Sequence, residues 1–213
     1  MALWNQFVDV LREAIFAYAQ VSHGNLATGI LGVTFLARLA LFPVTLRLAR
    51  AAATHQDRVR RIQPELDVLR VRYKQDPRRL AEETQRVFSR EGISMFPIGG
   101  LVGGLVQAPI LLALYSAVRQ CASVGGRFFW IADISKPDRL IVVLVAALTG
   151  ASAALAPQAT GHSKALMTVL PALLTMVFLS KMAAGVGLYW GVSSAVGVVQ
   201  TAIVQRGRTR SAA

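Results

Sequence analysis

The chain has 213 residues, of which 54% are hydrophobic and only 16% are charged, and its mean hydropathy is +0.49. This composition is too apolar for an ordinary water-soluble domain, and it excludes intrinsic disorder. The 17 glycines show no period and Cys121 is the single cysteine, which excludes collagen-like and disulfide-stapled folds. The net charge of +12 would suggest nucleic acid binding in a soluble protein, but the apolar runs argue against a specific nucleic acid partner.

Residues 1–25 are expected to form an amphipathic helix on the outer side of a membrane. Apolar side chains recur there at steps of three and four residues, whereas Asn5, Asp9, Arg12 and Glu13 occupy the other face. Two interpretations are open. The helix lies in the membrane interface, or it packs against the spans, and the second is compatible with a position at the surface.

Five apolar runs follow, each read as a transmembrane helix because about 20 helical residues cross a bilayer core of about 30 Å. They cover residues 26–46, 96–118, 140–156, 166–180 and 185–204. The segments between and after them are a cytoplasmic helical hairpin (47–95), two outer loops (119–139 and 181–184), a cytoplasmic loop (157–165) and a cytoplasmic tail (205–213). The third and fourth runs have 17 and 15 residues, so the bilayer is expected to thin around them. The predicted fold class is an all-α polytopic membrane protein.

The distribution of Lys and Arg predicts the orientation, because cytoplasmic loops retain positive charge. With five spans, 16 of the 23 basic residues fall on the side of the 47–95 segment and six on the opposite side. The remaining one, Arg38, lies inside a span. The N-terminus is therefore expected outside and the C-terminus in the cytoplasm.

The 47–95 segment is expected to form an antiparallel pair of helices that projects from the membrane. Leu66, Leu69 and Tyr73 make one apolar stripe, and Asp76-Pro77 resembles a helix N-cap followed by proline in the first turn. Pro64 is expected to begin the first helix or to kink it. The 47–95 segment has a net charge of +5, which is compatible with contact with a nascent chain, a ribosome or anionic lipid. The same charge is also expected if it reflects only the excess of Lys and Arg in cytoplasmic loops.

Arg38 is the one charged residue inside the predicted spans, and a buried arginine costs at least about 2.5 to 3.5 kcal/mol there. Polar residues on other spans repeat at helical spacing and could share one face with it. Together they predict a water-accessible, positively charged groove. Its candidate residues are Arg38, Thr34, Thr45, Gln107, Tyr115, Thr168, Thr175, Tyr189, Ser193 and Gln200. The alternative is that the hydroxyls and amides only bond neighbouring helices.

Several motifs, in order along nearly the whole chain, resemble the YidC/Oxa/Alb family of membrane protein insertases. They are Arg38-Leu39 with Leu41-Phe42-Pro43, Gln63-Pro64-Glu65-Leu66, Tyr73-Lys74-Gln75-Asp76-Pro77, Gln107-Ala108-Pro109-Ile110, the run from Trp130 to Asp138, and Gly187-Leu188-Tyr189-Trp190 with Ser193-Ser194. The resemblance implies a five-span core whose groove opens to cytoplasm and lipid and is closed outside. It also implies that the hairpin receives substrate, with Pro64, Glu65, Leu66, Tyr73, Asp76 and Pro77 as candidate contacts.

The function expected from these observations is the insertion of small membrane proteins in a bacterial inner membrane, without a cofactor, a nucleotide or an enzymatic reaction. The partners are nascent membrane proteins and the lipid bilayer, with the Sec translocon as a further possibility. Few residues follow Gln205, so ribosome contact is expected to be weak. Two alternatives stay open: a small-anion transporter that uses Arg38, and an assembly chaperone that does not translocate its substrates.

Overall fold

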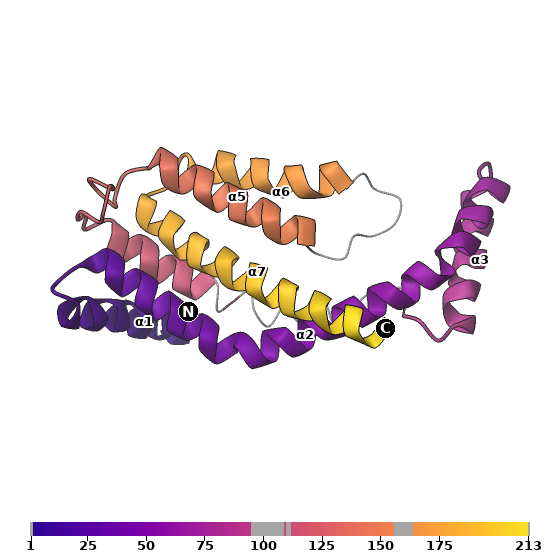
Figure 1. Cartoon of the computed structure of the whole chain (residues 1–213), viewed down its shortest axis with the longest axis horizontal. Helices are drawn as coiled ribbons and strands as arrows, with labels where there is room; N and C mark the ends of the chain where they lie inside the picture. The colour runs from indigo at the N-terminus through magenta and orange to yellow at the C-terminus, as the bar shows by residue number, and fades with distance from the viewer. Residues whose placement is uncertain (1, 95–108, 110–111, 156–163, 213) are drawn as a thin grey trace.

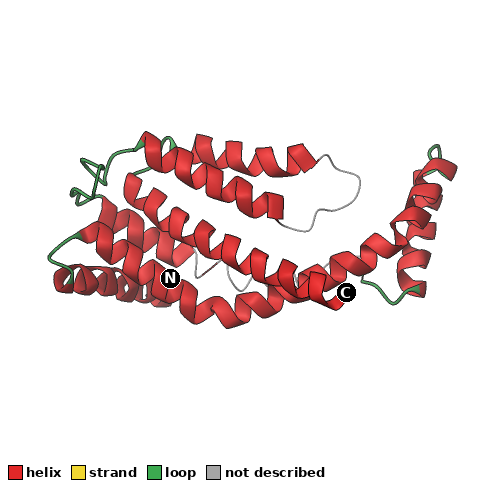
Figure 2. Cartoon of the chain, viewed as in Figure 1, coloured by secondary structure: helices red, strands yellow, loops and turns green. Residues whose placement is uncertain are grey.

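The computed structural model describes residues 2–94, 109, 112–155 and 164–212. Within these ranges the regular structure is helical (Figure 2). One isolated β-bridge joins Phe128 and Ile131. The helices are α1 (Ala2–Val21), α2 (Leu26–Arg72), α3 (Pro77–Arg90), α5 (Arg139–Leu155), α6 (Lys164–Leu179) and α7 (Ala184–Ala212), and residues 112–122 are also helical. The all-helical class predicted from the sequence is confirmed for the described residues.

Two glycines allow α1 to lie directly against α2. A Cβ on Gly29 would collide with the carbonyl oxygen of Ile15, and a Cβ on Gly32 would lie 2.5 Å from the Tyr18 ring. Ile15 and Ala19 are buried at this crossing, whereas Leu3 at the start of α1 is 82% exposed. The helix therefore packs against the bundle on one face and keeps an apolar face outward, which fits both interpretations of the predicted amphipathic helix.

Helix α2 extends much further than the predicted first span. Its N-cap is Asn25, whose Oδ1 accepts hydrogen bonds from the backbone N–H groups of Ala27 (3.1 Å) and Thr28 (3.3 Å). The helix continues through Pro43 and Pro64 and bends along its length before it meets α3 (Figure 1). Of the two expectations for Pro64, the helix start is wrong, because Pro64 lies inside α2, and the kink remains a prediction. A proline removes one backbone N–H and crowds the preceding turn, which favours bending over termination when the flanking residues are helix formers.

The far part of α2 and helix α3 form the expected antiparallel pair. Ile62 and Leu66 of α2 are buried against Val87 and Phe88 of α3. Asp76 caps α3 by accepting a hydrogen bond from the N–H of Arg79 (3.1 Å), and Pro77 occupies the first turn. The local prediction of a capped second helix is therefore confirmed.

Helices α5, α6 and α7 form the other part of the bundle, with α5 between α6 and α7. Small residues set the distance between α5 and α7, because a Cβ on Gly187 would collide with Ile141 and one on Gly191 would lie 3.3 Å from Val145. α7 also runs beside α2 and in the same direction (Figure 1). The helices α5 and α6 have 17 and 16 residues, so each is about 25 Å long.

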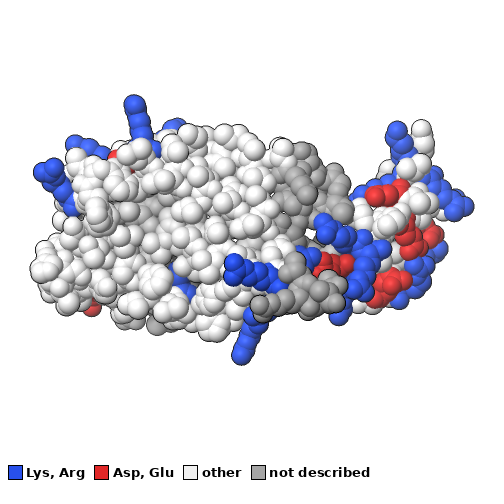
Figure 3. All heavy atoms as spheres, viewed as in Figure 1, with Lys and Arg blue, Asp and Glu red and all other residues white. Residues whose placement is uncertain are grey.

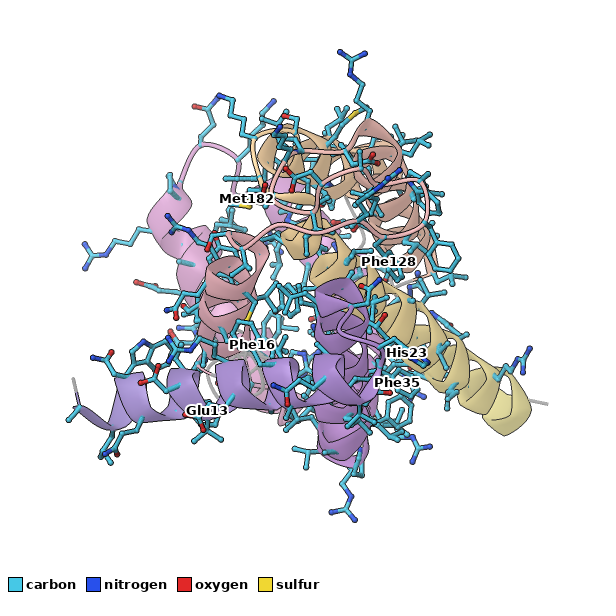
Figure 4. All side chains as sticks on the ribbon, turned by 90° about the vertical axis from the view of Figure 1, so that its left-hand side faces the viewer. Glu13, Phe16, His23, Phe35, Phe128 and Met182 are labelled. Carbon is cyan, nitrogen blue, oxygen red and sulfur yellow. The ribbon has the colours of Figure 1, made fainter. Side chains whose placement is uncertain are left out.

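The end of the bundle that carries the 123–138 loop is closely packed. Ile131 and Ile134 of this loop are buried together with Leu114, Val118 and Val186 in one apolar cluster. Figure 4 views the molecule from this end, with Phe128 and Met182 on segments that cross over the helices. This face is the predicted outer side.

Charged residues concentrate at the opposite end, around the far part of α2 and α3, whereas the surface between the two ends is nearly free of them (Figure 3). Two described helices, α2 and α7, are long and apolar enough to cross a membrane, and α5 and α6 contain shorter apolar stretches. Most of the predicted second span, including the glycine-rich residues 99–104 and Gln107, lies outside the described residues.

Candidate functional site: a cavity around Arg38

An open cavity of about 750 Å³ lies between the helices at the level of Arg38. Its lining comes from α2, residues 112–122, α5, α6 and α7, and from the turn after α6. The lining residues are Arg38, Leu112, Tyr115, Thr149, Ser152, Ala153, Pro171, Phe178, Met182, Tyr189, Trp190, Ser193, Ser194 and Gly197. Arg38 is the one charged residue in this set. The cavity therefore has a positive centre and largely apolar walls.

Arg38 reaches the cavity from the middle of the apolar part of α2 and is half-buried. Its Nε donates a hydrogen bond to Ser193 Oγ of α7 at 3.1 Å. No carboxylate of the described residues forms an ion pair with it. A guanidinium carries five N–H donors in a planar fork, so the bond to Ser193 leaves donor capacity for an acidic or polar guest.

A second group of hydroxyls lines the cavity from α5 and the next part of α7. Thr149 Oγ1 donates to the carbonyl oxygen of Val145 (2.9 Å) and lies 3.3 Å from Ser194 Oγ. Ser152 is one turn further along α5, and a Cβ on Gly197 of α7 would lie 3.7 Å from its Oγ. These three hydroxyls were not among the candidates from sequence. Thr149 and Ser152 belong to an Ala- and Gly-rich stretch of α5, and the signal that could have found them is their i, i+3 spacing. Ser194 follows the candidate Ser193 directly on α7.

Of the ten groove candidates from sequence, four line this cavity: Arg38, Tyr115, Tyr189 and Ser193. Thr45 and Gln200 lie seven residues beyond Arg38 and Ser193, and Gln200 Nε2 donates to the Thr45 carbonyl oxygen at 3.2 Å. This contact joins α2 to α7 on the hairpin side of the cavity. The tenth candidate, Gln107, lies outside the described residues.

The remaining three candidates lie elsewhere in the bundle. Thr34 is fully buried, and its hydroxyl has no hydrogen-bond partner among the described residues. Thr175 is also buried and donates to the carbonyl oxygen of Pro171 at 2.8 Å. The backbone carbonyl of Thr168 faces Gly150 of α5. Thr34 and Thr175 are thus turned into the bundle rather than toward the cavity, and the Thr175 hydroxyl bonds its own helix.

The hairpin candidates have mixed environments. Leu66 is buried and Asp76 is the α3 cap, so both support the local fold. Glu65 forms an ion pair with Arg90 (2.6 Å between Oε2 and Nη2), and Pro64 is exposed. Pro77 is exposed at the start of α3, and Tyr73 ends α2.

Two apolar residues of the hairpin were not singled out from the sequence. Val68 and Val71, on the last two turns of α2, are 65% and 80% exposed. They form an exposed apolar surface on the hairpin.

The described residues contain no group of three or more His, Cys, Asp or Glu that could hold a metal ion. The cavity itself is lined by the Arg38 guanidinium, by hydroxyls and by apolar side chains. Such a set can attract and solvate a polar or acidic segment next to lipid.

The family model described as "60Kd inner membrane protein" matches residues 17–211. The chain belongs to this family. The assignment agrees with the motif resemblance to the YidC/Oxa/Alb insertases and confirms it.

Curated relatives of the chain carry the name membrane protein insertase YidC. The protein of Mannheimia succiniciproducens is 31% identical over 86% of this chain, that of Histophilus somni strain 2336 is 30% identical over 96%, and that of Actinobacillus succinogenes is 29% identical over 96%. The matched regions are 34%, 38% and 38% of those proteins, so the chain spans little more than a third of their length.

Proposed function

We propose that the chain inserts small membrane proteins into the lipid bilayer, and that the cavity around Arg38 receives the hydrophilic segment that must cross. The observation that carries the proposal is a half-buried arginine in an open cavity between apolar helices, with Ser193 as its hydrogen-bond partner. An intramembrane charge is expensive and is kept where it has a function. The curated relatives named as insertases support the same conclusion.

The proposed mechanism uses no cofactor, nucleotide or catalytic residue. Arg38 attracts acidic groups in the substrate segment, and this attraction is stronger beside apolar walls than in bulk water. Polar groups and water in the cavity reduce the cost of moving a polar backbone partway across the membrane. The α5 and α6 helices, each about 25 Å long, shorten the remaining distance because the bilayer thins around them.

The apolar part of the substrate leaves toward lipid in this proposal. Helix α6 packs mainly against α5, and its other side chains are largely exposed, among them Leu173, Val177 and Phe178. Phe178 also lines the cavity. A substrate helix could therefore move from the cavity along α6 while it stays in contact with apolar side chains.

In the proposed topology the chain crosses the inner membrane of a bacterial cell five times. The N-terminus lies outside, and the hairpin and the C-terminal tail lie in the cytoplasm. The concentration of Lys and Arg at the hairpin end supports this orientation (Figure 3). The hairpin then makes the first contact with the nascent chain, through the exposed Val68 and Val71 and the neighbouring Pro64 and Glu65. Contact with the Sec translocon or the ribosome is secondary in this mechanism.

The test is insertion by the purified protein in liposomes. The substrate is a single-span protein with a short translocated tail, made in an acidic and a neutral version, and the measurement is the fraction of tail protected from external protease. We expect Arg38→Ala to reduce protection of the acidic tail more than that of the neutral tail, and Arg38→Lys to be partly active. Arg119→Ala is the matched control, because Arg119 is exposed near the outer end.

Other outcomes would change the conclusion. Equal activity of Arg38→Ala and wild type on the acidic tail would contradict the electrostatic mechanism. No protection by the wild-type protein would favour an assembly chaperone. Uptake of radiolabelled sulfate into the same liposomes, lost in Arg38→Ala, would favour a small-anion transporter.

A further inference from the structure

A second cavity, separate from that around Arg38, lies between α2 and the C-terminal part of α7. Its volume is about 900 Å³, and four arginines line it: Arg50, Arg60 and Arg61 of α2 and Arg208 of α7. We refer to these four residues and the space between them as the arginine pocket. It is nearer to the hairpin than Arg38 is, because all three α2 arginines follow the apolar part of that helix.

The pocket has a large excess of positive charge. Asp57 is the one acidic residue that lines it, and Asp57 forms an ion pair with Arg208 that joins α2 to α7. Arg50, Arg60 and Arg61 form no ion pair with a carboxylate of the described residues. The pocket thus has four arginines against one carboxylate, and the exposed side chains of Arg50, Arg60 and Arg61 leave a positive charge that attracts an anion.

Helical spacing places part of the lining on one face of α2. Arg50, Asp57 and Arg61 follow at steps of seven and four residues, so they lie on one face of α2. The buried part of the remaining lining is apolar and consists of Ala53 of α2 and Val204 of α7, whereas Thr54 and Gln205 add polar groups nearer the surface. The pocket therefore combines an apolar floor with a cationic rim.

The position along α2 corresponds to the lipid headgroups. Arg50 is 24 residues from Leu26, which is about 36 Å along the helix axis and just beyond a hydrocarbon core of about 30 Å. Arg60 and Arg61 lie roughly 15 Å further, and an arginine side chain can extend back toward the interface. The cytoplasmic leaflet carries anionic lipids at this level.

We propose that the arginine pocket binds the phosphate group of an anionic phospholipid of the cytoplasmic leaflet. The guanidinium fork binds phosphate oxygens in pairs, and the apolar floor suits the glycerol and upper acyl region of the same molecule. A free phosphate or a nucleic acid backbone would use the rim but leave the apolar floor uncovered. The site does not depend on insertase activity, so the two proposals can fail separately.

The test measures binding of short-chain lipids to the purified full chain in a neutral detergent. Dihexanoyl phosphatidylglycerol is titrated below its micelle concentration, and the thermal midpoint is followed by tryptophan fluorescence. Dihexanoyl phosphatidylcholine and glycerol 3-phosphate are the comparison ligands. We expect a saturable rise in the midpoint with phosphatidylglycerol alone.

The decisive variant is Arg50→Gln/Arg61→Gln, which is expected to weaken the apparent affinity for phosphatidylglycerol at least tenfold. Arg58→Gln/Arg78→Gln is the matched control, since it removes the same net charge from exposed positions outside the pocket. The single variant Arg60→Gln, expected to weaken binding severalfold, replaces the double variant if the latter does not fold.

Three results would overturn the proposal. The first is equal binding by Arg50→Gln/Arg61→Gln and by its control. The second is a response to glycerol 3-phosphate as strong as that to phosphatidylglycerol, which would assign the pocket to free phosphate. The third is a single-stranded RNA oligonucleotide that displaces phosphatidylglycerol and binds more tightly through the same arginines, which would assign the pocket to nucleic acid.

Discussion

Arg38 of α2 and Ser193 of α7 are joined by a hydrogen bond of 3.1 Å from Nε to Oγ, and seven residues further along both helices Gln200 Nε2 donates to the Thr45 carbonyl oxygen. The equal steps show that α2 and α7 run parallel in constant register beside the cavity. These polar contacts lie along one edge of the α2–α7 pair, and the Arg208–Asp57 ion pair adds a further contact between the two helices nearer to α3. The position of the Arg38 guanidinium thus depends on the pairing of two helices distant in sequence.

Removal of the serine hydroxyl is expected to have a moderate effect. Ser193→Ala deletes one hydrogen bond to a charged, half-buried group, which corresponds to about 1.5 to 3 kcal/mol of stability. The open cavity lets water replace part of this bond, so we expect the lower end of the range. Thermal unfolding in detergent measures the loss of stability. A double-mutant cycle that combines Ser193→Ala with Arg38→Lys measures the interaction energy between the two side chains. Full additivity of the two substitutions would show that the bond contributes nothing.

The crossing of α1 and α2 provides a test of packing. Gly29→Ala places a Cβ against the Ile15 carbonyl oxygen, which is backbone and cannot rotate away. We expect destabilisation of about 1 to 3 kcal/mol and faster proteolysis within α1. Gly207→Ala is the control, because a Cβ there meets nothing within 4 Å and alanine favours the helix. An unchanged thermal midpoint for Gly29→Ala would show that α1 is free to move away from α2.

The hairpin should be held by its apolar contacts more than by its ion pairs. Phe88→Ala removes a buried ring from the cluster that contains Ile62 and Leu66, and we expect a loss of about 3 to 5 kcal/mol in local stability. Glu65→Gln breaks the ion pair with Arg90, whose side chains are 42% and 60% exposed, and it should change stability by less than about 1 kcal/mol. Hydrogen exchange of the α3 amides measures the local stability of both variants. A larger loss in Glu65→Gln than in Phe88→Ala would contradict the prediction.

Much of this architecture could be predicted from the sequence because local signals were strong. Asp76-Pro77 fixes the start of α3, and the isolated Arg38 marks the cavity. The limits are equally specific. Periodicity shows that Thr34 and Arg38 share a face of α2, but it does not show how far the cavity extends along that face. In the structure Thr34 is buried in the bundle and does not line the cavity.

The hydroxyls of α5 show why some site residues could not be found in advance. Thr149 lies near Ser194 because Gly187 and Gly191 let α5 approach α7 closely. That proximity depends on how two helices pack together. The sequence of one apolar segment predicts which residues share a face of that helix, but not which residues of another helix they contact. Likewise, Pro64 is a helix breaker by local rules, yet α2 continues through it to form the hairpin.

The outer loop is expected to loosen at acidic pH. The pKa of Asp133 is lowered by hydrogen bonds from the hydroxyl (2.6 Å) and backbone N–H (2.9 Å) of Ser135, and Lys136 adds a weaker effect. A carboxylate whose pKa is lower in the folded state stabilises the fold fully above its unfolded pKa of about 3.9, and this stabilisation is lost as the pH falls through the lower folded value. The loop should therefore stay ordered at neutral pH and loosen below about pH 4.

Trp130 fluorescence can follow this transition, because Trp130 Nε1 donates to Asp138 Oδ1 (3.4 Å) within the same loop. The measurement is made with Trp4 and Trp190 replaced by phenylalanine. Asp133→Asn should show the loosened signal already at pH 7, whereas Asp9→Asn, in α1, should leave the transition unchanged. A pH profile identical in Asp133→Asn and the parent would exclude Asp133 as its cause.

The last prediction concerns the water content of the cavity around Arg38. In a Cys121→Ala background, Ser152→Cys lies on the cavity wall and Leu173→Cys on the exposed apolar surface of α6. A charged maleimide reacts with a thiolate, which forms in water but not in lipid. In membranes with the cytoplasmic side accessible, we expect Ser152→Cys to be labelled at least tenfold faster than Leu173→Cys. Leu114→Cys, buried in the apolar cluster with Ile131 and Ile134, should resist labelling from either side. Equal, slow labelling at positions 152 and 173 would show that lipid fills the cavity, and Arg38 would then lack the water that the insertion mechanism requires.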